Sequence, residues 1–386
     1  MPRRDTASEL PVVLDVRVVS GSGGGPDKTI LNSPRYLLPA GYRNLCAYMH
    51  RPGDPGFDQL ARKAAAWGAP IISVPDRGFW DWRIVPHFLD LCRRERVRLW
   101  HGHDYKSNLL GLLLRPFWPM RLVTTVHGWV HRTARTPLYY WLDRRCLPRY
   151  ERVICVSEDL CAEARRAGVP ARRCVLVENA IDTEEFARRH SPAEAKRRLG
   201  LDPGRLLVGA VGRLSAEKGF DLLIRAIDQL ARGGMDVGLI IAGEGDERPQ
   251  LDRLIAELGQ AARVRLLGYR ADPRELYEAM DVFALSSLRE GLPNVVLEAL
   301  AMETPVVATR IAGVPCVVRD GETGVLVEPG SVAELAQALA RLGGDADLRA
   351  RFARAGRQMI EQSYSFARRM DRIRAIYDEL LRREYP

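Results

Sequence analysis

Charged side chains follow two predicted buried strands of the second half of the chain, beginning with residues 206–211. That strand leads into Gly-Arg-Leu-Ser-Ala-Glu-Lys-Gly, which places Arg213 and Lys218 in a glycine-bounded loop before an amphipathic helix. Two cations beside a helix N-terminus can bind a polyanion such as a diphosphate, because the helix dipole favours negative charge and arginine can bind two oxygens at once. The alternative is a solvated loop in which Lys218 pairs with Glu217 or Asp221.

The second such strand, residues 281–286, leads into two glutamates eight residues apart, Glu290 and Glu298. Pro293 suits the first turn of a helix, and it would leave three backbone N–H groups free to face a ligand, those of Asn294, Val295 and Val296. Carboxylates suit sugar or ribose hydroxyls because they accept two hydrogen bonds. An exposed glutamate pair is the alternative, but Glu298 lies among apolar residues, where a buried carboxylate needs a partner.

The first half of the chain offers glycines and histidines after its predicted strands. The strand at 11–19 runs into a Gly-rich segment in which Gly24 and Gly25 would let the backbone approach a phosphate or sugar closely, or would form a flexible turn. The strand at 121–126 ends at His127, and the strand at 97–101 leads to His103. A single histidine is more often structural than functional, and for His103 both interpretations stay open.

Apolar runs that alternate with helical patterns must position these residues. Because strands buried on both faces are continuously apolar, this alternation predicts parallel sheets covered by helices, and hence two doubly wound α/β domains. Ligands in such sheets bind outside the carboxyl ends of the strands, where the charged loops lie. The predicted strands are 11–19, 97–101, 121–126 and 152–157 in the first half, and 206–211, 237–242, 263–268, 281–286 and 305–309 in the second.

A chain of 386 residues is too long to fold around a single compact core, and we expect two domains, a linker and a C-terminal helical segment. The first domain is predicted over 1–183 and the second over 204–364. Between them, 184–203 is charged and ends in Asp-Pro-Gly, which is typical of a linker. Residues 365–386 contain an amphipathic helix, expected to pack back on the first domain, with an apolar face made of Phe366, Met370, Ile373, Tyr377 and Leu380.

The composition is that of an ordinary globular protein, with 46% hydrophobic and 28% charged residues. No apolar run approaches the ~20 residues that span a bilayer. The first ten residues lack the apolar core of a secretory signal, so we expect a cytoplasmic protein. The seven cysteines are scattered without CxxC pairs, which favours small core hydrophobes over disulfides or a zinc site.

The net charge is uneven along the chain. Residues 1–200 carry 33 basic against 21 acidic side chains (+12), and residues 201–386 carry 25 against 28 (−3). The apolar stretch 109–120 has aromatic and basic neighbours, so it is either an interfacial patch that contacts anionic lipid at the inner face of the membrane, or a core helix beside a basic loop. The basic residues follow no motif that reads DNA or RNA, and we expect no nucleic-acid partner.

Taken together, GRLSAEKG and EGLPNVVLEALAMETPVVAT resemble the C-terminal domain of the retaining GT-B glycosyltransferases of family 4. The E-x7-E signature of that family matches Glu290 and Glu298, and its Arg/Lys pair matches Arg213 and Lys218. The resemblance covers nearly the whole chain and departs from the family pattern at Ala180, where the family has glycine. It implies the GT-B fold, in which two doubly wound Rossmann-like domains face each other across a cleft.

The resemblance also implies what each of these residues does. Arg213 and Lys218 would neutralise the diphosphate leaving group, Glu290 would bind the transferred sugar, and His127 would contact that sugar from the acceptor side. These four residues are the predicted catalytic residues, in a reaction with front-face attack and no covalent enzyme intermediate. The predicted donor-binding residues are Gly24, Gly25, Arg213, Lys218, Glu290, Gly291, Leu292, Asn294, Val295, Val296 and Glu298, of which Glu298 would bind the ribose.

The predicted activity is therefore transfer of a hexosyl-type group from a nucleotide-diphosphate sugar, as substrate, to a glycan or lipid-linked acceptor in polysaccharide or glycolipid biosynthesis. We expect no cofactor and no metal ion: Asp345-Ala346-Asp347 matches the DxD pattern of metal-dependent enzymes, but Asp345 is better explained as the N-cap of a helix. Two alternatives remain, a nucleotide-sugar epimerase of the same architecture and a non-catalytic binding protein.

Overall fold

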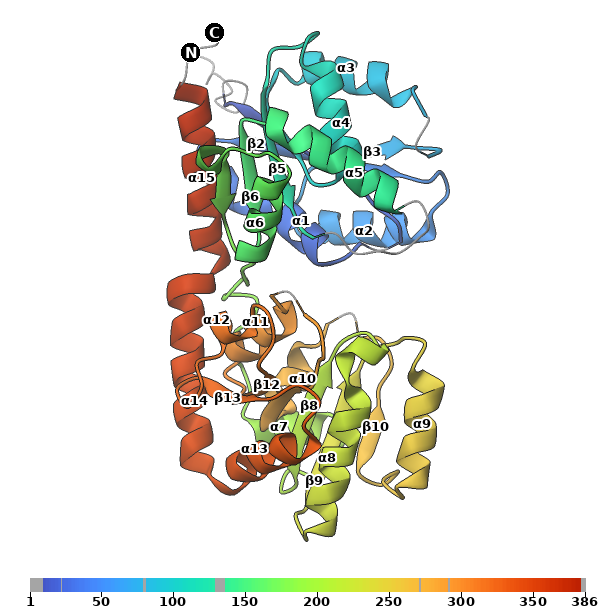
Figure 1. The fold of residues 1–386 in the computed structure, drawn as a ribbon, viewed down its shortest axis with the longest axis vertical. Helices are drawn as coiled ribbons and strands as arrows, with labels where there is room; N and C mark the ends of the chain where they lie inside the picture. The colour runs from blue at the N-terminus through green and yellow to red at the C-terminus, as the bar shows by residue number, and fades with distance from the viewer. Residues whose placement is uncertain are drawn as a thin grey trace, which may run out of the picture. The chain divides into compact units, whose positions relative to one another are not determined.

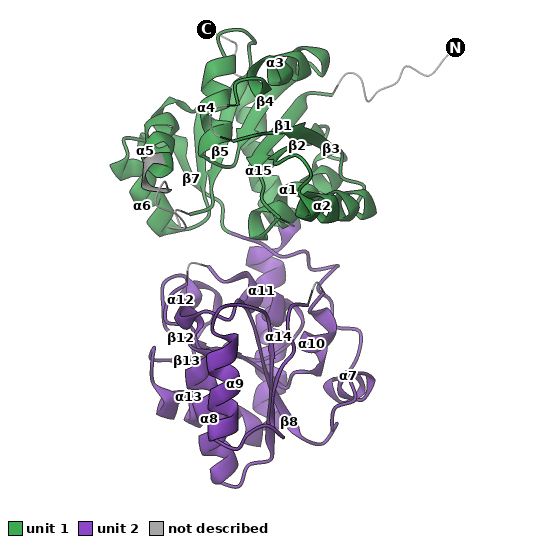
Figure 2. Ribbon diagram, turned by 90° about the vertical axis from the view of Figure 1, so that its right-hand side faces the viewer, with its two compact units in different colours: residues 1–178, 367–386 green, residues 179–366 purple. Residues whose placement is uncertain are grey.

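The computed structural model describes residues 10–21, 23–78, 81–128, 136–270, 272–290 and 292–382. The chain forms two compact units (Figure 2). Unit 1 consists of Met1–Glu178 together with Ala367–Pro386, and unit 2 consists of Asn179–Phe366. Each unit is an α/β domain in which helices flank a parallel sheet (Figure 1).

The described part of unit 1 contains a seven-stranded parallel sheet in the order β3-β2-β1-β4-β5-β6-β7. The chain runs outward from β1 to β3 and then returns to the other side of β1, so the strand order reverses between β1 and β4. The strands are β1 (Val12–Val18), β2 (Arg43–His50), β3 (Ile71–Pro75), β4 (Val97–Gly102), β5 (Arg121–Val126), β6 (Arg152–Cys155) and β7 (Cys174–Leu176).

Helices cover both faces of this sheet because successive strand residues point to opposite sides. In β2, Leu45, Ala47 and Met49 join one apolar core, while Cys46 and Tyr48 join the other. The helices and short 3-10 turns of unit 1 are α1 (Gly25–Leu37), α2 (Pro55–Ala66), α3 (Ile84–Arg94), α4 (Tyr105–Leu114), α5 (Thr136–Cys146), η2 (Leu147–Arg149), α6 (Glu158–Arg166), η3 (Ala171–Arg173) and α15 (Phe366–Arg382).

The last helix, α15, joins unit 1 although it is some two hundred residues distant in sequence (Figures 1 and 2). All five residues of its predicted apolar face are buried. Tyr42 donates a 2.5 Å hydrogen bond to Asp378, and Arg369 donates to the backbone oxygen of Val177 at 2.9 Å. The amphipathic pattern therefore predicted both the helix and its buried face.

Unit 2 repeats the doubly wound plan with a six-stranded parallel sheet in its described part. The order is β10-β9-β8-β11-β12-β13, which reverses between β8 and β11. The strands are β8 (Leu206–Val211), β9 (Val237–Ala242), β10 (Val264–Leu266), β11 (Val282–Leu285), β12 (Val306–Thr309) and β13 (Gly324–Val327). Leu207 and Val208, consecutive in β8, belong to the separate apolar cores on the two faces of the sheet.

The helices of unit 2 supply those cores. The predicted apolar face of α8 is wholly buried, since Phe220, Leu223, Ile224, Ile227 and Leu230 are at most 8% exposed. The helical elements are α7 (Pro192–Arg198), η4 (Ala216–Lys218), α8 (Phe220–Arg232), α9 (Arg248–Glu257), α10 (Arg274–Ala279), α11 (Asn294–Ala301), α12 (Val314–Val317), α13 (Val332–Gly344), α14 (Ala346–Met359) and the π-helix η5 (Ile360–Tyr364).

Residues 184–203, which we predicted to be a linker between domains, lie within unit 2. Helix α7 packs on α10, and its Ala195 is fully buried. Lys196 is buried as well and donates a 2.5 Å hydrogen bond to Asp281, while Arg188 donates to the backbone oxygens of Met302 and Glu278. The charged side chains that led us to predict a solvated linker thus include residues with hydrogen-bond partners within unit 2.

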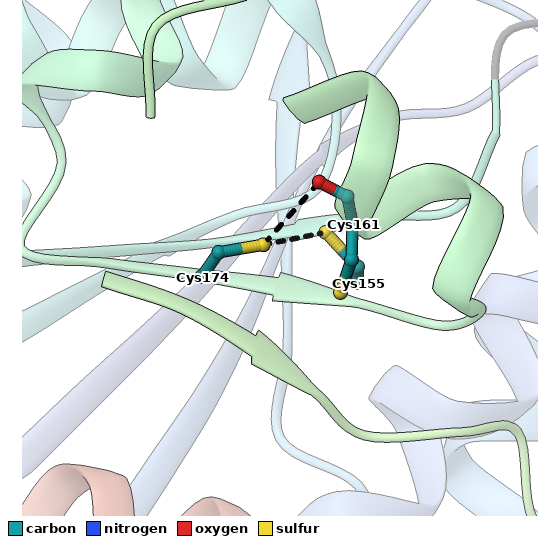
Figure 3. A group of neighbouring side chains, drawn as sticks. All are labelled: Cys155, Cys161 and Cys174. Atoms are coloured by element: carbon teal, nitrogen blue, oxygen red, sulfur yellow. Dashed lines mark hydrogen bonds between the residues drawn. The ribbon is translucent and has the colours of Figure 1, made fainter. Parts of the chain in front are cut away.

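Six of the seven cysteines are buried, as predicted for core residues, whereas Cys316 is exposed. Three of them, Cys155, Cys161 and Cys174, lie close enough together to hold a metal ion (Figure 3). Burial raises the pKa of Cys161 to about 11 and raises the pKa of Cys155 further. Since metals bind the thiolate, the raised pKa values of Cys155 and Cys161 favour neutral thiols packed as small apolar groups.

Candidate active site

The loops that follow β8 and β11 meet at the point where the strand order of unit 2 reverses. Lys218, in the first loop, lies 2.5 Å from the carboxylate of Glu290, in the second. Both side chains are largely buried, at 20% and 10% exposure. In open α/β sheets this reversal point is where ligands bind, at the carboxyl ends of the strands. The structure thus brings together the two charged segments that the sequence singled out.

Backbone hydrogen bonds hold the two loops together. The N–H of Leu288 donates to the oxygen of Glu217 at 2.8 Å, and the hydroxyl of Ser286 donates to the oxygen of Lys218 at 3.0 Å. Gly219 adopts the left-handed conformation, with φ 58°, and a Cβ atom there would lie 2.4 Å from the backbone oxygen of Ser286. Only glycine therefore allows Lys218 to approach the second loop this closely.

The two cations of this junction, Lys218 and Arg213, differ in whether they have an anionic partner. Glu290 accepts a 2.8 Å hydrogen bond from the hydroxyl of Ser287 on the same oxygen that Lys218 contacts. The side chain of Arg213 is exposed and makes no hydrogen bond or ion pair with the residues that the structure describes. One cation is thus paired with a carboxylate, and the other is available to an anionic ligand.

Helix α11 begins beside this junction and has no side-chain cap. Its N-cap is Pro293, which offers no side-chain acceptor, and its first turn contains no acidic residue. The N–H of Val296 donates to the oxygen of Pro293 at 3.1 Å, so our expectation that this group faces a ligand is wrong; the first turn uses it internally. Asn294, Val295 and Leu292 are half-buried. Gly291, also predicted to bind the donor, lies outside the described residues.

Glu298 lies deeper in the same helix and is only 3% exposed. As the apolar surroundings required, its carboxylate has a partner: the hydroxyl of Tyr277 donates to it at 2.8 Å. Burial, followed by the charge of Glu298, raises the pKa of Tyr277 well above its ordinary value, so the phenol stays protonated and remains a donor. Glu298 is accordingly held by the core of unit 2.

A third loop, which we did not predict, supports the first one from β9. The backbone N–H of Leu214 donates to the oxygen of Glu244 at 2.9 Å. A Cβ atom on Gly243 would lie 1.7 Å from the backbone oxygen of Gly212, and one on Gly245 would lie 2.2 Å from that of Leu214. The signal was present in the sequence as Gly-Glu-Gly directly after an apolar strand.

In unit 1, Gly24 and Gly25 form the start of α1. Gly24 is its N-cap and Gly25 its first residue, and both are exposed. The carboxylate of Asp27 accepts from the N–H of Gly24 at 2.6 Å and lies 2.8 Å from the guanidinium of Arg17. This helix N-terminus thus already has an anionic partner from its own first turn, unlike that of α11.

His127 follows β5 and is joined to two other side chains. Its Nε2 lies 3.1 Å from Nδ1 of His103, whose Nε2 lies 2.6 Å from the carboxylate of Asp15. The surrounding protein, together with His103 and Arg17, lowers the pKa of His127 well below its usual value. Burial likewise lowers the pKa of His103, and it lowers that of the adjacent His101 to about 3. These imidazoles are therefore neutral at physiological pH.

Asp15, His101 and His103 lie close enough together for a shared metal ion. Their facing atoms are already in hydrogen bonds, because Nδ1 of His101 lies 2.6 Å from the hydroxyl of Tyr377 and Nε2 of His103 contacts Asp15. The acidic DxD pattern is explained locally too. Asp345 is the N-cap of α14 and accepts from the N–H of Leu348 at 2.8 Å, which confirms the predicted cap.

Comparison with protein-family models assigns both halves of the chain. Residues 23–185 match the model described as Glycosyltransferase Family 4, and residues 192–359 match Glycosyl transferases group 1. The chain is also 31% identical over 327 residues to a D-inositol 3-phosphate glycosyltransferase of Corynebacterium glutamicum, which covers 77% of this chain and 76% of the relative. The chain belongs to the family 4 glycosyltransferases. The segments that carried the resemblance, around Lys218 and Glu290, both lie within the second match.

Two further relatives are glycosyltransferases by name. An alpha-D-kanosaminyltransferase of Streptomyces kanamyceticus is 34% identical over 254 residues, a match that spans 63% of this chain and 64% of the relative, less than two thirds of its length. A UDP-Gal:alpha-D-GlcNAc-diphosphoundecaprenol alpha-1,3-galactosyltransferase of Escherichia coli is 27% identical over 341 residues, 86% of this chain and 88% of the relative.

The fold matches solved structures over nearly its whole length. Anabaena HepE in complex with UDP superposes with a TM-score of 0.81 at 22% identity, covering 96% of this chain and all of the other. The same protein in complex with UDP-glucose gives a TM-score of 0.79 at 23% identity, covering 95% and 99%. The fold of this family 4 chain is therefore GT-B, with two Rossmann-like domains, as predicted.

Proposed function

We propose that the protein transfers a hexosyl group, with retention of configuration, from a nucleotide-diphosphate sugar to a glycan or lipid-linked acceptor in polysaccharide or glycolipid assembly. The observation that carries the proposal is the junction in unit 2, where Lys218 contacts Glu290 beside the uncapped N-terminus of α11. Exposed Arg213 adds a second cation. A diphosphate matches these groups, because it can accept from two cations and from helix N–H groups together.

Each group in this junction then has a role in breaking the glycosyl–phosphate bond. Negative charge grows on the departing diphosphate, and Arg213 and Lys218 stabilise it without a metal ion or cofactor. Lys218 must then share its charge between the diphosphate and Glu290, which becomes able to accept from sugar hydroxyls. The ribose is assigned to the region of Glu298, and the nucleotide sugar is a substrate.

Retention of the anomeric configuration is supported by the hydrogen bonds that Glu290 accepts. Its Oε1 accepts from Lys218 at 2.5 Å and from Ser287 at 2.8 Å. A carboxylate oxygen that is engaged by two donors is a weak nucleophile, which favours direct front-face transfer over a glycosyl-enzyme intermediate. On the acceptor side, we assign His127 to a hydroxyl of the transferred sugar, and Gly24 and Gly25 to the loop that adjoins the bound substrates.

The test measures release of nucleoside diphosphate from UDP-, GDP- and ADP-glucose, with and without glycan or lipid-linked acceptors. A prior screen of UDP, GDP and ADP for a rise in melting temperature selects the base. We expect release that requires an acceptor and a product whose anomeric proton coupling matches that of the donor. Acceptor-independent conversion of the sugar would identify an epimerase, and binding without turnover would identify a non-catalytic protein.

We also propose that unit 1 contacts anionic lipid at the inner face of the membrane. No helix in the described ranges combines the length and apolarity needed to cross a bilayer. Within the stretch 109–120, α4 buries Leu110 and Leu114, as a core helix does, but Leu113 and Phe117 are 38% and 64% exposed. On α5, which packs against α4, Trp141 is 54% exposed with Arg145 over its ring.

Flotation with phosphatidylglycerol vesicles at low salt tests this contact, with phosphatidylcholine vesicles as the matched control. We expect the protein to float with the anionic vesicles alone, and less so after Phe117→Ser and Trp141→Ser. Equal behaviour of both vesicle types would remove the membrane from the proposal and leave the transferase activity untouched.

A further inference from the structure

Three side chains of unit 1 form a hydrogen-bonded chain that ends at His127. Asp15 is in the middle of β1, His103 follows β4 and His127 follows β5. The carboxylate Oδ1 of Asp15 lies 2.6 Å from Nε2 of His103, and Nδ1 of His103 lies 3.1 Å from Nε2 of His127. Since β1, β4 and β5 are parallel neighbours, the sheet itself sets these distances.

The hydrogen bonds of this chain can be assigned a direction. The other oxygen of Asp15 accepts from the amide of Asn44 at 2.6 Å, so both carboxylate oxygens face donors, as suits an ionised carboxylate. His103 must then donate its single proton from Nε2 to Asp15 and accept at Nδ1. His127 in turn must donate from Nε2, which leaves its Nδ1 without a proton.

We propose that Asp15 and His103 are positioning residues that hold His127 in the Nε2–H tautomer, so that its Nδ1 accepts a hydrogen bond from a substrate hydroxyl. The inference rests on the proposed function, which assigns His127 to the transferred sugar. In this contact a hydroxyl of the sugar donates the hydrogen bond and Nδ1 of His127 accepts it. A neutral imidazole offers one donor and one acceptor, and which nitrogen faces the ligand is decided by the bond that the other nitrogen makes.

Burial keeps the imidazoles of this hydrogen-bonded chain neutral, whereas Asp15 is its charged member. His103 and Asp15 are 6% and 4% exposed, and burial is the main cause that lowers the pKa of His103. The positive charges of Arg17 and Arg369 lower it further. Burial also raises the pKa of Asp15, while His101 and the amide of Asn44 act in the opposite direction. A second proton on His103 would occupy Nδ1 and break its hydrogen bond with His127, and a second proton on His127 would occupy the Nδ1 that we expect to accept from the sugar.

A neighbouring network supplies a control because it does not include His127. His101 stacks on His103, with ring centroids 4.4 Å apart, and it contacts the hydroxyls of Tyr377 and Thr125 at 2.6 and 2.7 Å. Tyr377 is as deeply buried as Asp15. Tyr377→Phe takes away one buried hydrogen bond of His101, whose Nδ1 also lies 3.3 Å from Oδ1 of Asp15, and it keeps all three side chains of the chain from Asp15 to His127.

The test uses Asp15→Asn, His103→Gln and Tyr377→Phe in the full chain, together with ring ¹⁵N chemical shifts of selectively labelled histidine. In the wild type we expect a protonated Nε2 and a bare Nδ1 on His127. An asparagine at position 15 can donate to His103, which would reverse both tautomers without a change of shape. We expect Asp15→Asn and His103→Gln to lower kcat at least about 10-fold with little change in donor KM, and Tyr377→Phe to preserve kcat and the ¹⁵N signals of His127.

Other results would contradict, separately, the tautomer of His127, the positioning role of Asp15 and His103, or the assignment of His127 to the sugar. A wild-type His127 that carries its proton on Nδ1 would refute the inference even if both variants fail to fold, and so would a stoichiometric metal ion bound to Asp15, His101 and His103. If His127→Ala loses activity while folded Asp15→Asn and His103→Gln retain it, the positioning role is wrong and the proposed function stands. If His127→Ala transfers sugar at the full rate, the assignment of His127 in the proposed function is itself wrong.

Discussion

The two units use the same topological position for opposite kinds of chemistry. In unit 2 the reversal between β8 and β11 holds partly exposed charges, the pair of Lys218 and Glu290, next to a helix N-terminus without a side-chain cap. In unit 1 the reversal between β1 and β4 holds a buried carboxylate and neutral imidazoles, and the nearby helix N-terminus is capped by Asp27.

The difference teaches what a doubly wound sheet determines and what it leaves to individual residues. The sheet brings loop ends together at one edge, and the side chains decide whether that edge attracts an anion or orients a neutral hydrogen-bonding group. Charges that retain some exposure can exchange their partner for a ligand at low cost. A buried network cannot, because each broken hydrogen bond leaves an unsatisfied polar group.

Removing the charge from the reversal point of unit 2 should have the largest effect. We expect Lys218→Ala to lower sugar transfer about 10²–10³-fold, because one fixed donor to the leaving group is lost. The melting temperature should fall only modestly, since Glu290 keeps some exposure and a hydrogen bond from Ser287 when Lys218 is removed. Transfer is measured as acceptor-dependent release of nucleoside diphosphate.

The matched control for that variant is Arg232→Ala, which removes an exposed cation from α8 of the same unit. It should transfer at the wild-type rate. A Lys218→Ala protein that is folded and as active as this control would contradict the assignment of the diphosphate to this junction.

Altering the backbone that joins the two loops should be the next largest effect. Gly219→Ala places a Cβ atom 2.4 Å from the oxygen of Ser286 at a left-handed position, so we expect a loss of about 2–3 kcal/mol in the free energy of unfolding and a fall in donor affinity. Gly234→Ala is the control: its φ is 89°, but nothing lies within 4 Å of the added atom. Urea titration should show the smaller loss for Gly234→Ala, and equal losses would mean that backbone strain alone accounts for the effect.

The buried imidazoles make unit 1 sensitive to acid. Below pH 6.5 the histidines of an unfolded chain take up protons, whereas His101, with a pKa of about 3, stays neutral in the folded state. The unfolded state then binds more protons, so the free energy of unfolding falls as the pH drops from 6.5 towards 3, by about 2 kcal/mol at pH 5 for His101 alone. The raised pKa of Asp15 acts with the opposite sign, as the folded state gains that proton first.

Tryptophan fluorescence measures this effect in unit 1 specifically, because all seven tryptophans lie in residues 67–141. The denaturation midpoint followed by fluorescence should fall between pH 7.5 and pH 5.0. Unit 2 contains a single histidine, His190, so a transition that is seen by circular dichroism but not by fluorescence should shift less. The same shift in both transitions would place the acid sensitivity outside the histidine network.

How much the sequence could predict depended on where a residue sits relative to a strand. Lys218 and Glu290 lie in the loops that follow apolar strands, so the topology of a parallel sheet was enough to predict that these loops meet. Asp15 lies inside β1, and its contacts come from β2 and from the residue after β4, which no local pattern records. A polar residue within a buried strand does signal that a partner exists, since an unpaired carboxylate there would be costly.

The strands that were missed show the same limit. Strands β2, β3, β7 and β13 were not predicted, and β2 mixes polar and apolar side chains where we looked for continuous apolar runs. The charged segment from 184 to 203 was misjudged because its ion pairs join it to distant residues such as Asp281. For Glu298 the apolar neighbours indicated that a partner was needed, but that partner, Tyr277, is 21 residues away in sequence and no local pattern identifies it.

The smallest expected effect separates binding from transfer within the charged junction. Glu290→Gln keeps the shape of the side chain and removes the negative charge beside Lys218, so the lysine becomes fully available to a diphosphate. We expect affinity for the nucleoside diphosphate selected among UDP, GDP and ADP to rise about 2–5-fold, the range set by a partly exposed ion pair, while transfer falls because sugar hydroxyls lose an anionic acceptor. Calorimetric titration measures the affinity.

The matched control is Glu217→Gln, which changes an exposed carboxylate beside Lys218 in sequence. It should leave both the affinity for the nucleoside diphosphate and the rate of transfer unchanged. Weaker binding by Glu290→Gln would mean that the diphosphate does not compete with Glu290 for Lys218, and the contrast drawn between an exchangeable charged junction and a fixed neutral network would then fail.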